Sequence, residues 1–372
     1  MKTIIKKCDP VLVVAFVLAI ASAIWVKPDK SYFRYIDWRS LGILWSLMVI
    51  IQGFSENGVF ERIAMRLLRK DKNGLELSGI LVALCFFSGM LITNDVALLT
   101  FVPFAMMVLK SAGREDLICL VVVLQTIAAN LGSMLTPIGN PQNLYLYGTT
   151  GMDLVTFVDS MLPYTLLTVA MLISSLMFLP DKFARAHFEK KSFAEAKQSN
   201  KVQIVIYAGL FALALAVVLR VLPWMVLVGV TVAVVAVMDF KILHRADYVL
   251  LLTFVGFFIF TGNIGRIPQI HHELEKMIAG REFLTAVVVS QGISNVPATL
   301  LLADFAKDAQ ELLRGVNVGG LGTLIASMAS LISYKAYANE YADRKGYYMV
   351  RFTALNLIFL MGMLGLHALS NL

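Results

Sequence analysis

Long apolar segments, separated by short polar stretches, follow one another along the whole chain. The longest are residues 10–26, 40–55, 156–179, 202–219, 224–240, 248–264 and 348–369. Most are long enough, as helices, to cross or nearly cross a hydrocarbon core of about 30 Å. A hydrophobic share of 58% and a charged share of 15% agree with this pattern. The sequence therefore predicts an all-α polytopic membrane protein that contacts the lipid bilayer and has no nucleic-acid partner.

One motif occurs twice. Residues 129–144 are ANLGSMLTPIGNPQNL, and residues 316–331 are VNVGGLGTLIASMASL. When Asn130 is aligned with Asn317, the Asn, Gly, Thr, Ile and Leu positions coincide. A polar tripeptide between two apolar segments precedes each copy, Thr93-Asn94-Asp95 in the first half and Ser294-Asn295-Val296 in the second. Interrupted apolar segments in corresponding halves are typical of secondary transporters that bind substrate between two inverted-topology repeats.

The apolar segments around these tripeptides are short. The pairs 77–92 with 96–109 and 282–293 with 297–303 fall below the about 20 residues that a crossing helix needs. Basic residues flank the first pair on both sides, so we expect both of its ends in the cytoplasm. The sequence predicts re-entrant hairpins over 77–110 and 282–306, with their tips deep in the membrane. Irregular backbone at that depth must be buried in protein or line a cavity.

The two halves then define the domain organisation. The first repeat covers residues 1–180 with a broken helix at 117–148, and the second covers 223–372 with a broken helix at 315–337. A cytoplasmic linker and one unrepeated crossing occupy 181–222, which gives nine crossings and two hairpins. With a cytoplasmic N-terminus, 22 of the 32 Lys and Arg residues lie on the cytoplasmic side. A cleavable signal peptide is the alternative for the N-terminus, but cleavage would remove the counterpart of 224–240.

The two tripeptides are the first candidate binding residues. At a hairpin tip the backbone loses its helical partners, and the amides of Asn94 and Asn295 suit an ion or an anionic substrate. A helix that begins after the tip also favours an anion. Asp95 is a candidate cation ligand or proton carrier, because a charge near mid-membrane is costly. For all three residues the alternative is a helix cap; the counterpart of Asp95 is Val296.

The interruptions of the two broken helices supply the second set of candidates. Two prolines four residues apart cannot both lie inside a regular helix, so freed carbonyls and nearby side chains are expected to form an oxygen cage for Na⁺. A simple proline kink is the alternative. The candidates are Asn130, Ser133, Thr136, Pro137, Gly139, Asn140 and Asn143, with Asn317, Gly320, Gly322, Thr323 and Ser327 in the second half. Na⁺ is expected near Asn94, Ser133 and Gly139, and near Asn295 and Gly322.

Other reactive residues give little functional signal. His271-His272-Glu273 lacks the spacing of an HExxH zinc site and is expected in a polar external loop. The three cysteines show neither CxxC nor His-paired spacing. No paired catalytic carboxylates or Gly-x-Ser-x-Gly motif is found in the membrane segments. The sequence therefore predicts no enzyme and no cofactor other than Na⁺ or H⁺ as coupling ion.

With these motifs the chain resembles the ion transporter superfamily, which contains divalent anion:Na⁺ symporters, arsenite permeases and Na⁺/H⁺ antiporters. It is most similar to compact bacterial members of the citrate-transporter-like, anion-permease family. In the divalent-anion symporters, Ser-Asn-Thr tripeptides at the two tips bind the carboxylate and help hold Na⁺. The resemblance implies these roles for Thr93-Asn94 and Ser294-Asn295, with Thr299 as the nearest later hydroxyl. The Asn94-Asp95 pair looks more like the arsenite permeases and antiporters.

The resemblance implies elevator-type transport, often a homodimer, and a place in the bacterial cytoplasmic membrane. We therefore expect a secondary active transporter that moves a small anion, a carboxylate or inorganic oxyanion, together with Na⁺ or H⁺. The alternative is a Na⁺/H⁺ antiporter or an arsenite-type efflux permease that uses Asp95. A membrane-embedded enzyme or a receptor without transport is a third class, which no motif supports.

Overall fold

The computed structural model describes residues 10–67, 72–184 and 200–370. Within these ranges the chain folds into helices and contains no strand. By length and composition, eight of the described helices can cross a membrane, or nine if the bent pair α4 (Trp38–Glu56) and α5 (Val59–Leu67) is one span. The predicted all-α polytopic fold is confirmed, and the chain is a multi-pass membrane protein.

The predicted apolar segments coincide with helices to within a few residues. The first half contains α2 (Pro10–Ser22), α3 (Tyr32–Tyr35), α4, α5, α6 (Gly74–Ile92), α7 (Asn94–Ser111), α8 (Ile118–Gly132), α9 (Pro141–Thr149) and α10 (Leu154–Met177). After α11 (Lys201–Val218), the second half contains α12 (Trp224–Leu243), α13 (Tyr248–Gly265), α14 (Pro268–Ile278), α15 (Glu282–Ile293), α16 (Asn295–Leu302), α17 (Ala309–Val318), α18 (Met328–Glu340) and α19 (Lys345–Ser370).

One expected loop is a helix. His271-His272-Glu273 belongs to α14, so the prediction of a loop there is wrong. Pro268 occupies the first turn of α14, where its missing N–H removes no helical hydrogen bond. Among the described residues, no group of three or more His, Cys, Asp or Glu side chains could hold a metal ion.

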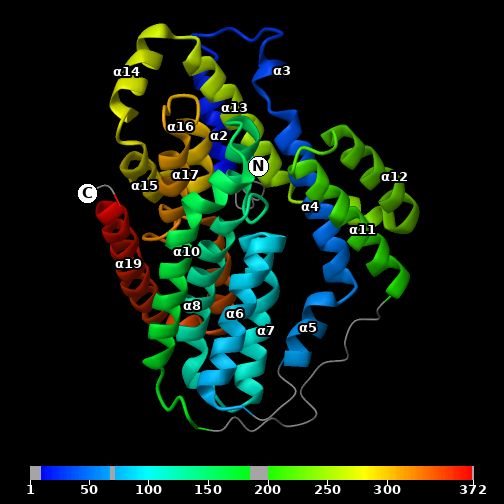
Figure 1. Cartoon of the computed structure of the whole chain (residues 1–372), viewed down its shortest axis with the longest axis vertical. Coiled ribbons are helices and arrows are strands. Elements are labelled where there is room, and N and C mark those ends of the chain that lie inside the picture. The colour runs from blue at the N-terminus through cyan, green and yellow to red at the C-terminus, as the bar shows by residue number, and fades with distance from the viewer. Residues whose placement is uncertain (1–9, 68–71, 185–199, 371–372) are drawn as a thin grey trace.

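Two hairpins lie at opposite ends of the long axis of the molecule (Figure 1). In the first, α6 and α7 pack against each other and against α8; in the second, α15 packs against α16 and α17. The residues between the arms adopt nearly the same unusual backbone, with φ 72° and ψ 148° at Thr93 and φ 75° and ψ 153° at Ser294. Positive φ is uncommon outside glycine, so the two tips share a specific turn.

The remaining helices pair between the halves. α2 packs against α13, and α12 packs against α4, with α11 beside both α4 and α12. Asp37 and Asp247 cap α4 and α13 with the same backbone angles, and each carboxylate accepts a backbone N–H three residues later at 3.1 and 3.0 Å. The two helices therefore begin in the same way, and the division of the chain into two repeats stays a prediction. The inverted relation of the two repeats stays a prediction.

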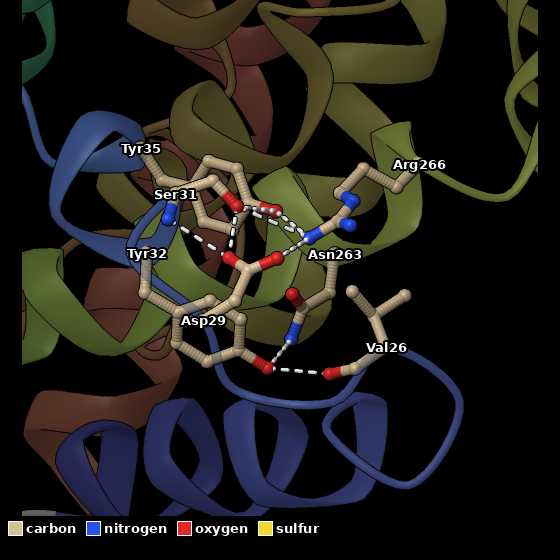
Figure 2. Close-up of polar contacts among 7 residues, drawn as sticks. All are labelled: Val26, Asp29, Ser31, Tyr32, Tyr35, Asn263 and Arg266. Carbon is tan, nitrogen blue, oxygen red and sulfur yellow. Dashed lines mark hydrogen bonds and ion pairs between the residues drawn. The ribbon is translucent and has the colours of Figure 1, made fainter.

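A polar network fixes the connection between α2 and α4 on the end of α13 (Figure 2). Arg266 donates to the Asp29 carboxylate at 2.9 Å and to the Tyr35 hydroxyl at 3.1 Å. Asn263 donates to the Tyr32 hydroxyl at 2.9 Å. Since these partners lie more than 200 residues apart in sequence, the network joins the two halves of the chain.

The predicted number of crossings stays a prediction. α2 has 13 residues, about 20 Å at 1.5 Å per residue, which is shorter than a hydrocarbon core. The residues before α2 and most of the expected cytoplasmic linker, 185–199, lie outside the described residues.

Candidate functional site

Each hairpin tip is bound to the interruption of the broken helix that follows it. The backbone N–H of Asn94 donates to the Gly139 carbonyl at 3.1 Å, and that of Asn295 donates to the Ala326 carbonyl at 2.9 Å. Gly139 and Ala326 occupy equivalent positions in the aligned motifs. The same contact therefore holds both tips, although the acceptor residues differ.

Two threonines repeat a second contact. The Thr136 hydroxyl donates to the carbonyl of Met90, and the Thr323 hydroxyl donates to the carbonyl of Gln291 at 3.0 Å. Both acceptors lie three residues before the first residue of a tip tripeptide. The sequence candidates Thr136 and Thr323 thus bind the last turn of a hairpin arm, and their hydroxyl protons are already committed.

The interruption of the first broken helix has its own support. After α8 the chain forms one turn of 3₁₀-helix (Ser133–Leu135) and resumes at α9. The amide nitrogen of Asn143 donates to the carbonyls of Ser133, Met134 and Thr136 at 3.3, 3.2 and 3.1 Å. The interruption thus releases these three carbonyls from helical hydrogen bonding, and the Asn143 side chain satisfies them.

The two interruptions meet in one buried polar group, the central cluster, formed by Asn94, Asn130, Asn140, Asn317 and Ser327. The Oδ1 atom of Asn130 accepts from the Asn94 amide at 3.0 Å and from the Ser327 hydroxyl at 2.9 Å. The Oδ1 atom of Asn317 accepts from the Asn140 amide at 3.0 Å. All five side chains are buried. The aligned asparagines of the two motifs therefore each contact the interruption of the other half.

The second tip leaves one amide without a partner. Gly320 allows close approach, because a Cβ there would lie 2.9 Å from the Asn295 amide nitrogen. No group in the described parts of the chain accepts a hydrogen bond from that nitrogen. Thr299, by contrast, donates its hydroxyl to the Asn295 carbonyl at 2.7 Å inside α16. The structure therefore places the Asn295 amide, and not the Thr299 hydroxyl, in position to donate.

Asp95 begins α7 beside the first tip. Its backbone N–H donates to Oδ1 of Asn94 at 3.0 Å, and its side chain is half-buried. Over residues 10–67, 72–184 and 200–370, neither a backbone N–H nor a side chain donates to its carboxylate, and no side chain forms an ion pair with it. In the described residues the Asp95 carboxylate therefore does not cap α7.

Two glutamines that the sequence motifs do not predict, Gln291 and Gln125, also support the site. Gln291 donates to the carbonyls of Gly319 and Leu321 at 3.1 and 3.0 Å and accepts from the Thr323 N–H at 2.9 Å. It also contacts the position of Gly322, whose φ is 102°. Gln125 is fully buried in α8 and donates to backbone carbonyls of both arms of the first hairpin. A lone amide inside an apolar segment was the available signal in both cases.

The sequence matches a known family over most of its length. The family model described as citrate transporter matches residues 3–332, which include both hairpins and both interruptions. The chain belongs to the citrate transporter family. The resemblance stated from the motifs is therefore confirmed, and this citrate transporter family protein is a membrane transporter.

Its relatives carry similar descriptions. An uncharacterized transporter of Methanocaldococcus jannaschii is 32% identical over 308 residues, 82% of each chain. An inner membrane protein of Escherichia coli is 29% identical over 311 residues, also 82% of each chain. A silicon efflux transporter of rice is 30% identical over 156 residues, 41% of this chain and 31% of the rice protein. These names favour a protein that moves a solute over one that catalyses a reaction.

Proposed function

We propose that this protein is a secondary active transporter that binds a small anion, a carboxylate or an inorganic oxyanion, between its two hairpin tips and moves it together with Na⁺ or H⁺. The matched tips support this proposal most directly. α7 and α16 begin at Asn94 and Asn295, so the positive ends of two helices adjoin the tip asparagines. The unpaired amide of Asn295 adds a hydrogen-bond donor for an oxygen ligand.

The coupling to a cation follows from Asp95. A free carboxylate next to an anion site repels the anion, so the anion binds better once a cation or a proton neutralises Asp95. Because such coupling is reciprocal, the bound anion raises the affinity for the cation by the same factor as the cation raises the affinity for the anion. The Gly139 carbonyl accepts one hydrogen bond from Asn94 and keeps a second lone pair for Na⁺. We place the first Na⁺ near Asn94, Ser133 and Gly139, and a second near Asn295 and Gly322.

The cellular setting belongs to the same proposal. The Escherichia coli relative is named an inner membrane protein, and we place this chain in a bacterial cytoplasmic membrane with its N-terminus in the cytoplasm. Large apolar side chains are exposed along α10, α12 and α19. We assign part of this surface to lipid and part to a second copy of the chain in a homodimer.

Thermal unfolding of the purified protein tests the binding site. Ligands that bind the folded state raise the unfolding temperature. At a ligand concentration 100 times the dissociation constant, the free energy of unfolding rises by about 2.7 kcal/mol. We expect Na⁺ with one member of a panel of carboxylates and oxyanions to stabilise the wild type more than the same anion without Na⁺, and Asn94→Ala and Asn295→Ala to lose this Na⁺-dependent part of the response. Asn356→Ala is the matched control, because Asn356 is a buried asparagine in α19 that bonds within its own helix. A Na⁺-dependent response to the anion that persists in both tip variants contradicts the proposal.

A second candidate is a Na⁺/H⁺ antiporter or an oxyanion efflux permease that works through Asp95. The free carboxylate and the similarity to a silicon efflux transporter favour it. Flux in proteoliposomes separates the candidates. Asp95→Asn is expected to abolish exchange by an antiporter, whereas a symporter keeps anion-dependent stabilisation with an altered dependence on Na⁺ or pH.

A further inference from the structure

A polar pocket of about 470 Å³ lies away from the hairpin tips, where the ends of several helices meet. The start of α4, the end of α9, and the connection from α11 into α12 form its walls. The residues that matter are Arg39, Gly148, Arg220, Pro223 and Trp224. Two arginines and no acidic side chain are among its described lining residues, so the pocket is positively charged.

Arg220 is held in a fixed position. Its guanidinium donates to the carbonyls of Tyr147, Gly151 and Met152 at 2.6, 3.2 and 3.1 Å. It also lies over the Tyr147 ring, 4.8 Å from the centroid. The carbonyls satisfy its N–H groups without cancelling its charge. Arg220 therefore caps the end of α9 and leaves a net positive charge at the pocket wall.

Arg39 has no such partner. Its Nη1 atom lies 2.6 Å from the point that a Cβ on Gly148 would occupy. Gly148 follows Tyr147, the residue that Arg220 contacts. Within the described ranges, no hydrogen bond or ion pair satisfies its guanidinium. Asp37, the nearest acidic residue in sequence, is bound instead to the N–H and the hydroxyl of Ser40. A half-buried guanidinium thus faces the pocket with its donors unused.

The start of α12 adds to the positive potential. Pro223 is the N-cap and gives no side-chain hydrogen bond to the first turn of this 20-residue helix. Both Pro223 and Trp224 line the pocket. The partial positive charge of a helix N-terminus therefore adjoins the two guanidinium groups.

We propose that this pocket is a second anion-binding site, which takes a carboxylate or an inorganic oxyanion through Arg39. Guanidinium groups bind both chemistries with two parallel hydrogen bonds. In the predicted topology the pocket opens on the external face. α9, nine residues long, joins it to the central cluster at Asn140. A role in collecting substrate for the tips rests on the proposed function, whereas anion binding in the pocket does not.

Binding is tested by thermal unfolding of the full chain in sulfate and in citrate, compared with chloride at equal ionic strength so that screening is constant. Arg39→Gln is expected to raise the half-saturating anion concentration at least about tenfold, because charged hydrogen bonds are lost. Gly148→Ala keeps the charge but displaces the guanidinium, and is expected to weaken binding too. Arg34→Gln removes an exposed arginine of α3 outside the pocket and should leave the response unchanged.

A second measurement does not depend on stability. In a variant whose only tryptophan is Trp224, iodide, an anion, should quench its fluorescence more strongly than neutral acrylamide does. Added sulfate should reduce this difference by competition, and Arg39→Gln should reduce it without sulfate, because only Arg220 and the start of α12 then supply the positive potential. An iodide effect that is equal with and without Arg39 overturns the proposal.

The results for the pocket and for the tips are distinguishable. Anion stabilisation that survives Arg39→Gln and disappears in Asn94→Ala overturns the pocket and leaves the tip site standing. Stabilisation lost in Arg39→Gln and kept in Asn94→Ala supports the pocket. If the stabilisation follows this pattern and the wild-type protein shows no anion flux in proteoliposomes, the proposal for the pocket stands and the proposed function fails.

Discussion

The close contact between α8 and the first hairpin predicts that one chemical change has opposite effects at two glycines. A Cβ on Gly132 would lie 2.4 Å from the backbone carbonyl oxygen of Phe86 in α6. A Cβ on Gly79, in α6 itself, would meet nothing closer than a Leu176 methyl group at 3.9 Å. Gly132→Ala and Gly79→Ala therefore add the same methyl group to two helices of one bundle.

The expected magnitude follows from the geometry. Real Cβ atoms essentially never come closer than 3.0 Å to another atom, so α8 and α6 must separate by about 0.6 Å in Gly132→Ala. The van der Waals attraction of one atom pair in contact is about 0.15 kcal/mol, and a gap of that size removes about a third of it. Over about 40 pairs the loss is about 2 kcal/mol, within the usual range for overpacking. Gly79→Ala avoids this loss and gains about 0.5–1 kcal/mol of helix preference.

The assay is the apparent unfolding temperature of both variants in the same detergent, without ligand. We expect Gly132→Ala to unfold below the wild type and Gly79→Ala at or above it. Equal unfolding temperatures for the two variants would refute the reasoning, because then the backbone contact does not limit the approach of the helices.

Three further predictions concern contacts outside the hairpins. Gly262→Ala should lower the unfolding temperature, because its Cβ would lie 2.3 Å from the Tyr35 ring, whereas Gly265→Ala, with open space around it, should not. Arg114→Lys should destabilise the protein by about 2 kcal/mol in the same assay, because the buried guanidinium donates to a carboxylate and to three carbonyls that an ammonium group cannot all reach. Hydrogen bonds from Ser31 lower the pKa of Asp29, so its contribution to stability is present above the unfolded pKa and is lost as pH falls through the folded pKa. The difference in unfolding temperature between wild type and Asp29→Asn should therefore shrink on acidification.

Hydropathy predicted the long helices because burial in lipid demands apolar side chains over nearly their whole length. It did not predict α5 or α14, which contain charged residues. A helix with one polar and one apolar face has no long apolar run, so the plain hydropathy pattern does not reveal it. For this reason hydropathy predicts a loop over the α14 residues, although Pro268 in the first turn of the helix is a usable start signal.

The site was predictable where its contacts depend on position in the repeat. Alignment of the two motifs pairs Gly139 with Ala326, and both carbonyls bind a hairpin tip because any residue supplies a carbonyl. Gln291 was not predictable in this way. Its acceptors are backbone carbonyls 28 and 30 residues away, and the sequence gives no sign of which carbonyls an interruption will leave free.

The two interruptions, although matched in position, are stabilised differently, and this difference bears on coupling. Asn143 satisfies the carbonyls of the first interruption from within the same broken helix. Gln291 satisfies those of the second interruption from the hairpin arm. A movement of the second hairpin therefore disturbs, through Gln291, the hydrogen bonds of the interruption carbonyls, whereas the corresponding carbonyls of the first interruption keep their bonds to Asn143. The first half instead carries the free carboxylate, Asp95. In the proposed mechanism, the chemistry of the cation thus belongs to the more self-contained half, and the additional linkage through Gln291 between hairpin and interruption belongs to the other.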